Sequence, residues 1–569
     1  MLLRAFTTAL LSLSLAACAT LPAPQSTAAP TPTRFEAGMV SAADPRAAEA
    51  GAEILRKGGS ATDAAIATML ALTVVEPQSS GIGGGGFYVR GNADGMVDTI
   101  DGRETAPALA KPDWFLDSDG KPLPFREAVA SGLSIGVPGN VALAAEAHRR
   151  HGKLAWRDLF APAIRLARQG WILSERGRDF LLRNKATGMR DKAAAALFYD
   201  AGGEPLPVGT KLTNPVLAET LERIAERGSQ AFYNGQDGAD LAIAVARDTP
   251  RKATMTEADV MNYKARYRKP VCGTYRAYKV CGMGPPSSGA TTVLSILGMM
   301  ERFDLSQMSA SSPTFWHLFA EAQRLAYADR ERFLADPDFV SVPVPQLIDR
   351  DYLAHRSGLI RADKTAETVE PGLDLIPPDG DEPPENGTSH FAVVDRDGNA
   401  VSYTSTIEGP FGSGLMHDGF FLNNELTDFS FVPEKDGLPV ANRVEGGKRP
   451  RSSMAPSLVY GPDGKLVLAV GAAGGGTIPV QVTKSIIAFI DWKLPIAEAI
   501  AVPVLYSPDD TVIVEKGSAL EALIPGLKAL GHARVVAYSL PLKTNAVAVT
   551  SQGLIGAGDP RSEGVAVSQ

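Results

Sequence analysis

Residues 386–406, NGTSHFAVVDRDGNAVSYTST, are the stretch that decides the expected fold. Apolar and polar residues alternate on both sides of Asp397-Gly398, and an Asp-Gly pair readily adopts the positive φ angles that a tight hairpin turn requires. The pattern therefore predicts two antiparallel strands, over residues 389–395 and 400–407.

A threonine opens this hairpin, directly after the acidic, proline-rich segment 371–386, whose composition is typical of an exposed loop. If the bond between Gly387 and Thr388 is cut, Thr388 keeps its hydroxyl and gains an α-amino group. That amine has a reference pKa of about 7.7 to 8.0, so it can accept the hydroxyl proton near neutral pH. Gly387 has no side chain to obstruct attack of the hydroxyl on its carbonyl. The hypothesis is an inactive precursor that cuts itself before Thr388, although an isolated threonine here is more often only a β-forming residue.

Length and composition exclude other classes of protein. With 569 residues, of which 44% are hydrophobic, the chain can bury a large core and is too long for one typical domain. Two closely packed halves or two domains are expected. The net charge of -8, with acidic and basic residues interspersed, gives no polybasic surface for nucleic acid.

The amino terminus has the order of a secretory signal: one arginine, a short apolar run, then small residues. Leu15-Ala16-Ala17-Cys18 is similar to a bacterial lipobox. We therefore expect removal of residues 1–17, lipidation of Cys18, and a periplasmic protein anchored to the bacterial envelope. The alternative is an ordinary cleaved signal in which Cys18 has no role. Residues 18–34, rich in Ala, Pro and Thr, are expected to form a tether before the fold begins near Phe35.

Helical patterns dominate from Ala42 to about Asp336. Ser60-Ala-Thr-Asp63 resembles a capping box with Asp in place of Glu, and Asn214-Pro215 places proline where a first helical turn tolerates it. A second hairpin is expected around Pro462-Asp463-Gly464, and a helix over about 478–491.

Cys272 and Cys281 flank GTYRAYKV, a segment that predicts two short strands around a turn. In an oxidising periplasm they could form a disulfide across a hairpin. The alternative is two free buried thiols, because the sequence does not fix the distance between them.

Several motifs resemble those of γ-glutamyltranspeptidases, a family of N-terminal nucleophile hydrolases. Thr388-Ser389-His390-Phe391 and the residues after it resemble the start of that family's small subunit. Further matching blocks follow in the same order: FLNNELTDF (421–429), KRPRSSMAP (448–456), GAAGGG (471–476) and DPRS (559–562). Blocks similar to the large subunit precede it: VSAADPRAAEAGAEILRKGGSATDAAIA (40–67), EPQSSGIGGGGF (76–87), DGRETAP (101–107) and GPPSSGA (284–290).

The resemblance implies an α+β fold, a four-layer αββα sandwich. It implies that one precursor is cut into a helix-rich large subunit, residues 35–387, and a small subunit, residues 388–569, which form a heterodimer. The implied activity is hydrolysis or transpeptidation of glutathione and related γ-glutamyl amides through an acyl ester on Thr388, with water, an amino acid or a peptide as acceptor. No metal or organic cofactor is implied.

The resemblance also assigns roles to single residues. Thr406, across the hairpin from Thr388, would hydrogen-bond the nucleophile. Gly474 and Gly475 would present backbone N–H groups to the oxyanion of the tetrahedral intermediate. The other residues would bind the glutamyl group: Arg103, Ser452 and Ser453 its α-carboxylate, and Glu425 and Asp428 its α-ammonium group.

Two features depart from the family pattern. Glu408 stands where many transpeptidases carry Asn and some acylase-like or capsule-processing relatives carry Glu, so its carboxylate is expected either to pair with the substrate ammonium or to indicate a different acyl group. The segment between Phe429 and Lys448 is shorter than the lid-bearing stretch of many relatives. The alternatives are an acylase of the same fold, acting on glutaryl or cephalosporin side chains or on poly-γ-glutamate, and a non-catalytic surface lipoprotein.

Other patterns are interpreted as structural. Residues 81–86 satisfy GxGxxG, but they follow a helical pattern and not a strand, which argues against dinucleotide binding. The seven histidines, His148 and His151 among them, do not assemble with carboxylates or cysteines at metal-ligand spacing. His390 is also expected to be structural.

Overall fold

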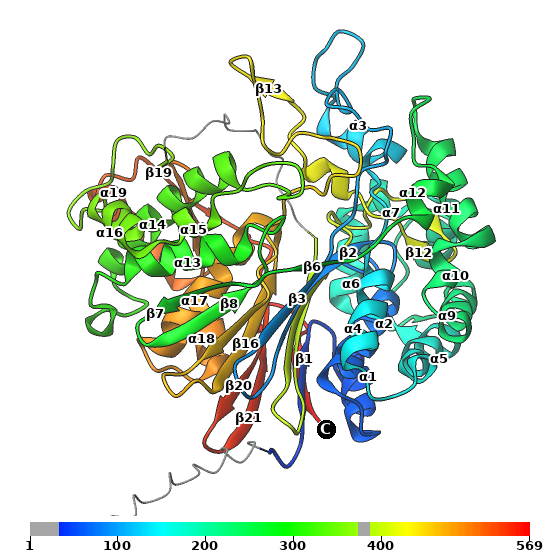
Figure 1. The fold of residues 1–569 in the computed structure, drawn as a ribbon, viewed down its shortest axis with the longest axis horizontal. Coiled ribbons are helices and arrows are strands. Elements are labelled where there is room, and N and C mark those ends of the chain that lie inside the picture. Colours follow the sequence, from blue (N-terminus) through cyan, green and yellow to red (C-terminus); the bar gives the residue numbers. More distant parts are fainter. Residues whose placement is uncertain (1–33, 374–386) are drawn as a thin grey trace, which may run out of the picture.

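The computed structural model describes residues 34–373 and 387–569 and consists of four layers (Figure 1). Two β-sheets pack against each other in the centre, and a layer of helices covers the outer face of each. The predicted αββα sandwich of the α+β class is confirmed. The predicted signal, Cys18 and nearly all of the tether lie outside the described residues, as does most of the proline-rich segment before Gly387.

The first sheet has seven strands in the order β22-β1-β9-β10-β2-β3-β6, and its neighbouring strands are antiparallel. The predicted first hairpin is confirmed as β9 (Ser389–Val394) and β10 (Ala400–Thr406), near the middle of the sheet. The other strands are β1 (Met39–Ala42), β2 (Gly85–Gly91), β3 (Val97–Gly102), β6 (Arg266–Arg268) and β22 (Val565–Ser568).

The second sheet has six antiparallel strands in the order β21-β20-β16-β15-β8-β7. The predicted second hairpin is confirmed as β15 (Ser457–Tyr460) and β16 (Leu466–Ala473). The other strands are β7 (Val271–Tyr275), β8 (Tyr278–Gly282), β20 (Lys543–Thr550) and β21 (Gly553–Gly558). Cys272 and Cys281 lie opposite each other on β7 and β8 and form a disulfide, which decides between the two alternatives.

Side chains of β9 alternate between two cores. Phe391 and Val393 pack into the core beneath the first helical layer, whereas Ala392 and Val394 belong to the core between the sheets. This alternation follows from the pleat of a strand, because successive side chains point to opposite faces. A strand with both faces buried therefore reads as an almost continuous apolar run, as SHFAVV does.

The first helical layer is built on α1 (Pro45–Arg56) and α2 (Ala61–Val75). Every residue of α2 is buried, and the predicted capping box is confirmed: Ser60 Oγ accepts from the N–H of Asp63, whose carboxylate accepts from the N–H of Ser60. The layer continues with α4 (Asn140–His151), α5 (Ala161–Gln169) and α9 (Pro215–Arg227). Asn214 caps α9, with proline in the first turn as predicted.

The second helical layer covers the other sheet. It contains α13 (Gly289–Met300), α14 (Pro313–Phe333), α17 (Ile478–Ile490) and α18 (Ile496–Ala501). α17 confirms the helix predicted over about 478–491. Among the described helices, none combines the length and the apolar character needed to cross a membrane.

The remaining helices and strands are shorter or lie outside these layers. The helices are α3 (Phe125–Val129), α6 (Glu175–Arg183), α7 (Lys185–Gly188), α8 (Lys192–Phe198), α10 (Gln230–Tyr233), α11 (Gly235–Asp248), α12 (Glu257–Met261), α15 (Val344–Leu347), α16 (Arg350–Gly358) and α19 (Ile524–Ala529). The strands are β4 (Trp171–Ile172), β5 (Lys211–Leu212), β11 (Met416–His417), β12 (Phe420–Phe421), β13 (Glu434–Lys435), β14 (Leu438–Pro439), β17 (Leu505–Tyr506), β18 (Thr511–Glu515) and β19 (Arg534–Tyr538).

Both central sheets combine strands from before and after Thr388. In the first sheet, β9 pairs with β1, and β10 pairs with β2. In the second sheet, β15 pairs with β8. The two halves of the chain are therefore not separate domains, and a cut at Gly387 would leave two chains that share both sheets.

Candidate active site

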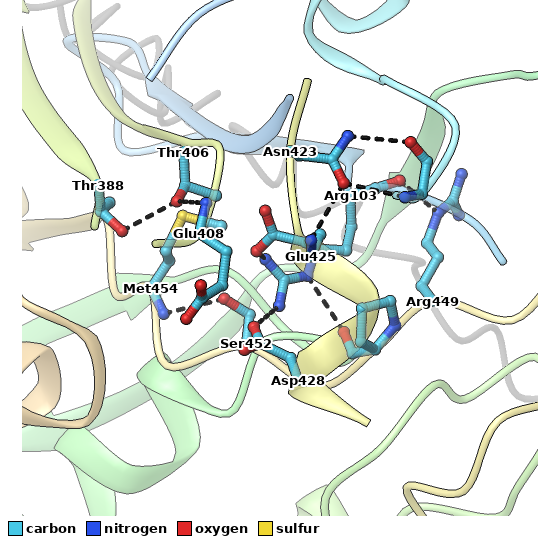
Figure 2. Close-up of polar contacts among 12 residues, drawn as sticks. Arg103, Thr388, Thr406, Glu408, Asn423, Glu425, Asp428, Arg449, Ser452 and Met454 are labelled. Atoms are coloured by element: carbon cyan, nitrogen blue, oxygen red, sulfur yellow. Dashed lines mark hydrogen bonds and ion pairs between the residues drawn. The ribbon is translucent and has the colours of Figure 1, made fainter. Parts of the chain in front are cut away.

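Thr388 and Thr406 face each other at one end of the β9–β10 hairpin. The register pairs Ser389 with Ser405, which places Thr406 opposite Thr388. The Thr388 hydroxyl donates to Thr406 Oγ1 over 3.1 Å, and both side chains are buried (Figure 2). The structure thus brings the two predicted hydroxyl groups together.

The Ser79 carbonyl oxygen holds the backbone at this point. It accepts hydrogen bonds from the N–H groups of Thr388, at 3.1 Å, and Ile407, at 3.3 Å. The same carbonyl could accept from an α-amino group on Thr388 and so orient that amine. Sequence reasoning did not identify Ser79, although it lies in the EPQSSG block before the glycine run.

Gly387 is required by packing as well as by chemistry. A Cβ atom on Gly387 would lie 1.5 Å from the carbonyl oxygen of Glu408, far inside any permitted contact. The next residue, Thr388, has a φ of 105°, which β-branched residues rarely adopt. The bond that is predicted to be cut therefore joins a residue that cannot carry a side chain to one with a strained backbone, a combination found at functional sites.

Glu408 extends the site beyond Thr406. Its backbone N–H donates to Thr406 Oγ1 over 2.8 Å, and its carboxylate accepts a hydrogen bond of 2.6 Å from Asn424 Nδ2. Figure 2 shows the Glu408 side chain between the threonine pair and Ser452. A carboxylate at this position can attract a cationic group of a bound molecule.

The glycine run over residues 81–86 packs directly against the nucleophile hairpin. A Cβ atom on Gly84 would lie 1.9 Å from the carbonyl oxygen of Thr406. The run leads from α2 into β2, so its glycines allow two backbones to approach closely. This supports its interpretation as structural and not as a dinucleotide site.

Arg103 follows the end of β3 and is only 1% exposed. Its guanidinium forms ion pairs with Glu425 and Asp428, and its Nη2 donates to the Arg451 carbonyl oxygen over 2.8 Å. The two acids open and close the 3₁₀ helix η4 (Glu425–Asp428), in which residues three apart lie on the same face. The residues predicted to bind the two ionic groups of the substrate therefore lie together and contact one another (Figure 2).

Ser452 and Ser453 lie in a loop that is fixed to the segment before α13. The Ser288 hydroxyl donates to the Ser452 carbonyl oxygen over 2.8 Å. Ser452 Oγ accepts from the N–H of Met454 over 3.2 Å, and Ser453 Oγ accepts from Arg330 Nη2 over 2.6 Å. A hydroxyl group can both accept and donate a hydrogen bond.

Glu104 is a neighbour of Arg103 that sequence reasoning missed, although it stands in the same DGRETAP block. Its side chain is completely buried. Burial raises the pKa of the Glu104 carboxyl to about 7, against the opposing effect of the Arg103 charge. Its charge therefore changes near neutral pH, which alters the ionic balance around Arg103.

Gly474 and Gly475 connect β16 to α17 through the short helix η5 (Gly475–Thr477). Gly474 and Thr388 line the same cavity of about 520 Å³. The φ of 125° at Gly474 favours glycine, and a Cβ there would lie 2.0 Å from the Pro541 carbonyl oxygen. N–H groups at a helix amino terminus carry partial positive charge, so this position suits an oxyanion.

A buried ion pair beside the nucleophile strand was also missed. Lys543 Nζ lies 3.0 Å from Glu76 Oε2, and the Ser389 hydroxyl donates to the same oxygen over 2.6 Å. Although burial opposes the shift, the charge of Lys543 lowers the pKa of the Glu76 carboxyl. Neither residue belongs to a motif that connects it to the other, because 467 positions separate them in the sequence.

His390 has the packing of a structural residue. Its Nδ1 bonds Thr404 Oγ1 at 2.9 Å, and a Cβ atom on Gly471 would lie 2.4 Å from its ring. Burial lowers the pKa of the His390 ring to about 3, so the ring is neutral at physiological pH. Across residues 34–373 and 387–569, no three His, Cys, Asp or Glu side chains form a group that could hold a metal ion.

The arrangement can support acyl transfer to a hydroxyl group. Thr388 can act as a nucleophile, N–H groups at the start of η5 can bind an oxyanion, and the cluster around Arg103 carries both signs of charge. Both signs are needed to bind an α-amino acid group, which carries an ammonium and a carboxylate.

Comparisons with known proteins agree with this chemistry. The family profile described as Gamma-glutamyltranspeptidase matches residues 47–569. A glutathione hydrolase proenzyme of Bacillus subtilis (strain 168) is 38% identical over 512 residues, which cover 87% of this chain and 85% of the relative. One of Escherichia coli (strain K12) is 37% identical over 545 residues, 93% of this chain and 91% of the relative. The crystal structure of cephalosporin acylase from Bacillus halodurans has a TM-score of 0.80 at 25% identity and covers 96% of this chain and 99% of its own.

Proposed function

The chain belongs to the gamma-glutamyltranspeptidase family, and from this premise we propose that it cuts itself before Thr388 and then hydrolyses or transfers the γ-glutamyl group of glutathione and related amides. One observation carries the proposal: the Thr388 hydroxyl, on the residue directly after Gly387, is buried and donates to Thr406 Oγ1 over 3.1 Å.

Self-cutting uses the hydroxyl of Thr388 on its own backbone. The hydroxyl attacks the Gly387 carbonyl carbon, its proton passes to the Thr388 nitrogen, and the C–N bond breaks as an ester forms between Gly387 and Thr388 Oγ1. Water then hydrolyses the ester, which leaves a carboxylate on Gly387 and restores the hydroxyl beside a free α-amine. The strained φ of Thr388 favours this step, because cutting removes the constraint on that angle.

Turnover repeats the same chemistry on a bound amide. The α-amine of Thr388 takes the hydroxyl proton, Oγ1 attacks the γ-carbonyl carbon, and the N–H groups of Gly474 and Gly475 bind the oxyanion. The proton passes to the leaving amine as the C–N bond breaks, and an acyl ester remains on Thr388. Water or a second amine then attacks the ester and releases glutamate or a new γ-glutamyl amide.

The residues around Arg103 bind the glutamyl group. Its α-carboxylate pairs with Arg103 and the hydroxyls of Ser452 and Ser453, while Glu425 and Asp428 bind its ammonium. The ion pairs that join Arg103 to the two acids support this assignment. The carboxylate of a bound glutamyl group can take the place of the acids beside Arg103, and its ammonium group can take the place of Arg103 beside the acids. Glu408 adds a third carboxylate on the ammonium side.

The test of this function begins with the purified protein on a denaturing gel. The wild type is expected to show two fragments, one with Thr388 at its amino terminus, and to release the chromophore from a γ-glutamyl anilide. Thr388→Ala is expected to remain one uncut chain with no measurable turnover. A wild type that stays intact yet is fully active would contradict the mechanism, and an intact, inactive wild type would favour a non-catalytic surface lipoprotein.

A second candidate function is favoured by the structural match to a cephalosporin acylase. An acylase that removes a glutaryl group would have no use for residues that bind an ammonium. The wild type is therefore compared on γ-glutamyl and glutaryl anilides, which differ only in the α-amino group. The proposed function requires at least tenfold faster γ-glutamyl release, and the opposite preference would favour the acylase. Poly-γ-glutamate is tested as a third donor.

We further propose the location and subunit limits that the sequence indicates. Residues 1–17 form a signal, Cys18 carries a lipid that anchors the protein in the periplasm, residues 18–34 form the tether, and the subunits span residues 35–387 and 388–569. The lipobox supports the anchor. Labelled palmitate should enter the wild type and not Cys18→Ser, and label in both or in neither would contradict it.

A further inference from the structure

The cavity that contains Thr388 extends beyond the residues assigned above. It has a volume of about 520 Å³, within the usual range for small-molecule sites. Thr388, Gly387 and Gly474 lie on its wall, but none of the residues around Arg103 does. Its lining comes instead from α6, from the segment before β20 and from the Arg561 loop. The nucleophile therefore borders a space whose wall does not include the residues proposed to bind the glutamyl group.

Cationic side chains outnumber acidic ones on the wall of this space. Four cationic side chains and one carboxylate line it: Arg176, Arg183, Lys543, Arg561 and Asp179. Three of the cations have acidic partners at short distance. Arg183 Nε lies 2.8 Å from Asp179, Lys543 Nζ lies 3.0 Å from Glu76, and Arg561 Nε lies 2.6 Å from Asp559.

Arg176 differs from these three, because among the described residues it forms no ion pair. Its Nη1 donates weakly to the Arg561 carbonyl oxygen, over 3.4 Å, and its guanidinium lies 5.1 Å from the centre of the Phe180 ring. Its Nε is buried and has no hydrogen-bond acceptor in the described part of the chain. The nearby acid Glu76 is already bonded to Lys543 and Ser389.

A guanidinium that lines a cavity and has no acidic partner among the described residues can bind an anionic group there. We infer that Arg176 binds the carboxylate of the amine that leaves Thr388 or attacks its acyl ester. The inference rests on the proposed function, in which the residues around Arg103 bind the glutamyl group. The leaving or attacking amine must then lie on the other side of Thr388, in the cavity of about 520 Å³. An amino acid or peptide carries a terminal carboxylate, whose two oxygens match the paired donors of a guanidinium.

The first experiment changes only the substrate. The wild-type kcat/KM is measured for three donors. They are glutathione, an analogue of glutathione in which the glycine carboxylate is a carboxamide, and a γ-glutamyl anilide, whose leaving amine has no carboxylate. A hydrogen-bonded ion pair predicts roughly a tenfold to hundredfold preference for the free acid over the carboxamide. Equal rates for acid and carboxamide would overturn the inference. Absence of turnover on all three donors would instead refute the proposed function.

The second experiment changes the residue. Arg176→Gln is expected to lower kcat/KM for glutathione by roughly tenfold to a hundredfold and to reduce the acid-to-carboxamide ratio to about one. Arg176→Lys should restore part of the ratio. Arg178→Gln, on the same helix but away from the cavity wall, is the matched control and should keep the wild-type ratio. Two fragments on a gel verify that each variant folds and cuts itself. An Arg176→Gln enzyme that keeps the full preference would refute the role of Arg176.

Discussion

Thr406 Oγ1 is the acceptor for two donors, the Thr388 hydroxyl at 3.1 Å and the Glu408 backbone N–H at 2.8 Å. The oxygen thus links the position of the nucleophile to the backbone turn at Glu408, whose φ is 71°. Removal of a buried acceptor leaves both donors unsatisfied, which costs more than the net value of one hydrogen bond.

Thr406→Ala should therefore slow self-cutting by about tenfold to a hundredfold, from a loss of roughly 1 to 3 kcal/mol. Thr406→Ser keeps the oxygen and should cut within a few-fold of the wild-type rate. The rate is measured from the conversion of precursor into two bands over time. Equal rates for the alanine and serine variants would show that the Thr406 hydroxyl has no part in the step.

The buried carboxyl group of Glu104 should make the stability of the fold depend on pH. Its pKa is raised to about 7 in the folded protein, above its ordinary value of 4.5, so folding favours the protonated form. The resulting stability is fully present below pH 4.5 and is lost as the pH rises through 7. Over this window the loss is up to about 3 kcal/mol.

Glu104→Gln removes this titration. The melting temperature of the variant should rise relative to that of the wild type by a few degrees between pH 5 and pH 8, as thermal unfolding followed at both pH values would detect. Glu127→Gln, at an exposed position on α3, is the matched control and should follow the wild type. A constant difference between Glu104→Gln and the wild type would contradict the prediction.

Among the elements, the ends of strands and helices carry the site. Thr388 precedes β9, Thr406 ends β10, Arg103 follows β3, and Gly474 follows β16. The rigid sheets fix these ends relative to one another, while the loops beyond them carry the chemical groups. A helix, α6, supplies Arg176 from outside the sandwich.

The β7–β8 hairpin at the edge of the second sheet carries the disulfide between Cys272 and Cys281. Closing a loop with a sequence separation of 9 is expected to stabilise the fold by about 2 to 3 kcal/mol. Replacement of both cysteines by serine should lower the melting temperature by a few degrees without changing kcat/KM. Tryptic digestion without reductant, followed by mass spectrometry, should find the two cysteine peptides linked. Alkylated, unlinked peptides would contradict the disulfide.

At the scale of the whole molecule, both sheets combine strands from the two sides of Thr388. β9 pairs with β1 of the preceding half, and β15 pairs with β8. The cut product should therefore elute from gel filtration under native conditions as one particle that contains both fragments, and the fragments should separate only in denaturant. Residues 388–569 expressed alone should be insoluble, because they lack β1, β2, β7 and β8. A soluble, monomeric small fragment would contradict this.

The fold by itself does not choose between the two acyl groups. A cephalosporin acylase shares the sandwich with this chain at a TM-score of 0.80, and the relatives by sequence include both glutathione hydrolase proenzymes and acylase proenzymes. We expect the choice to depend on a few charged residues around Arg103 and on Glu408, which is why the proposed experiments compare substrates that differ by a single charged group.

The sequence alone determined features that depend on neighbouring residues. Asp397-Gly398 fixed the hairpin, Ser60 and Asp63 fixed the start of α2, and the glycine-threonine junction indicated the nucleophile. These signals are local, because turn, cap and strand preferences act over a few positions. The resemblance to a family added residues that no local pattern would have selected, such as Arg103.

Only the tertiary structure decided which distant side chains meet. It paired Arg103 with both Glu425 and Asp428 and joined Glu76 to Lys543. It placed Arg176 on the wall of the cavity that Thr388 lines, with no acidic partner in the described part of the chain. It also placed Cys272 opposite Cys281. Such contacts depend on the order and register of strands that lie hundreds of positions apart in the sequence. The turn, cap and strand preferences of neighbouring residues do not determine that order. The electrostatics of the site, including the raised pKa of Glu104, follow from this packing.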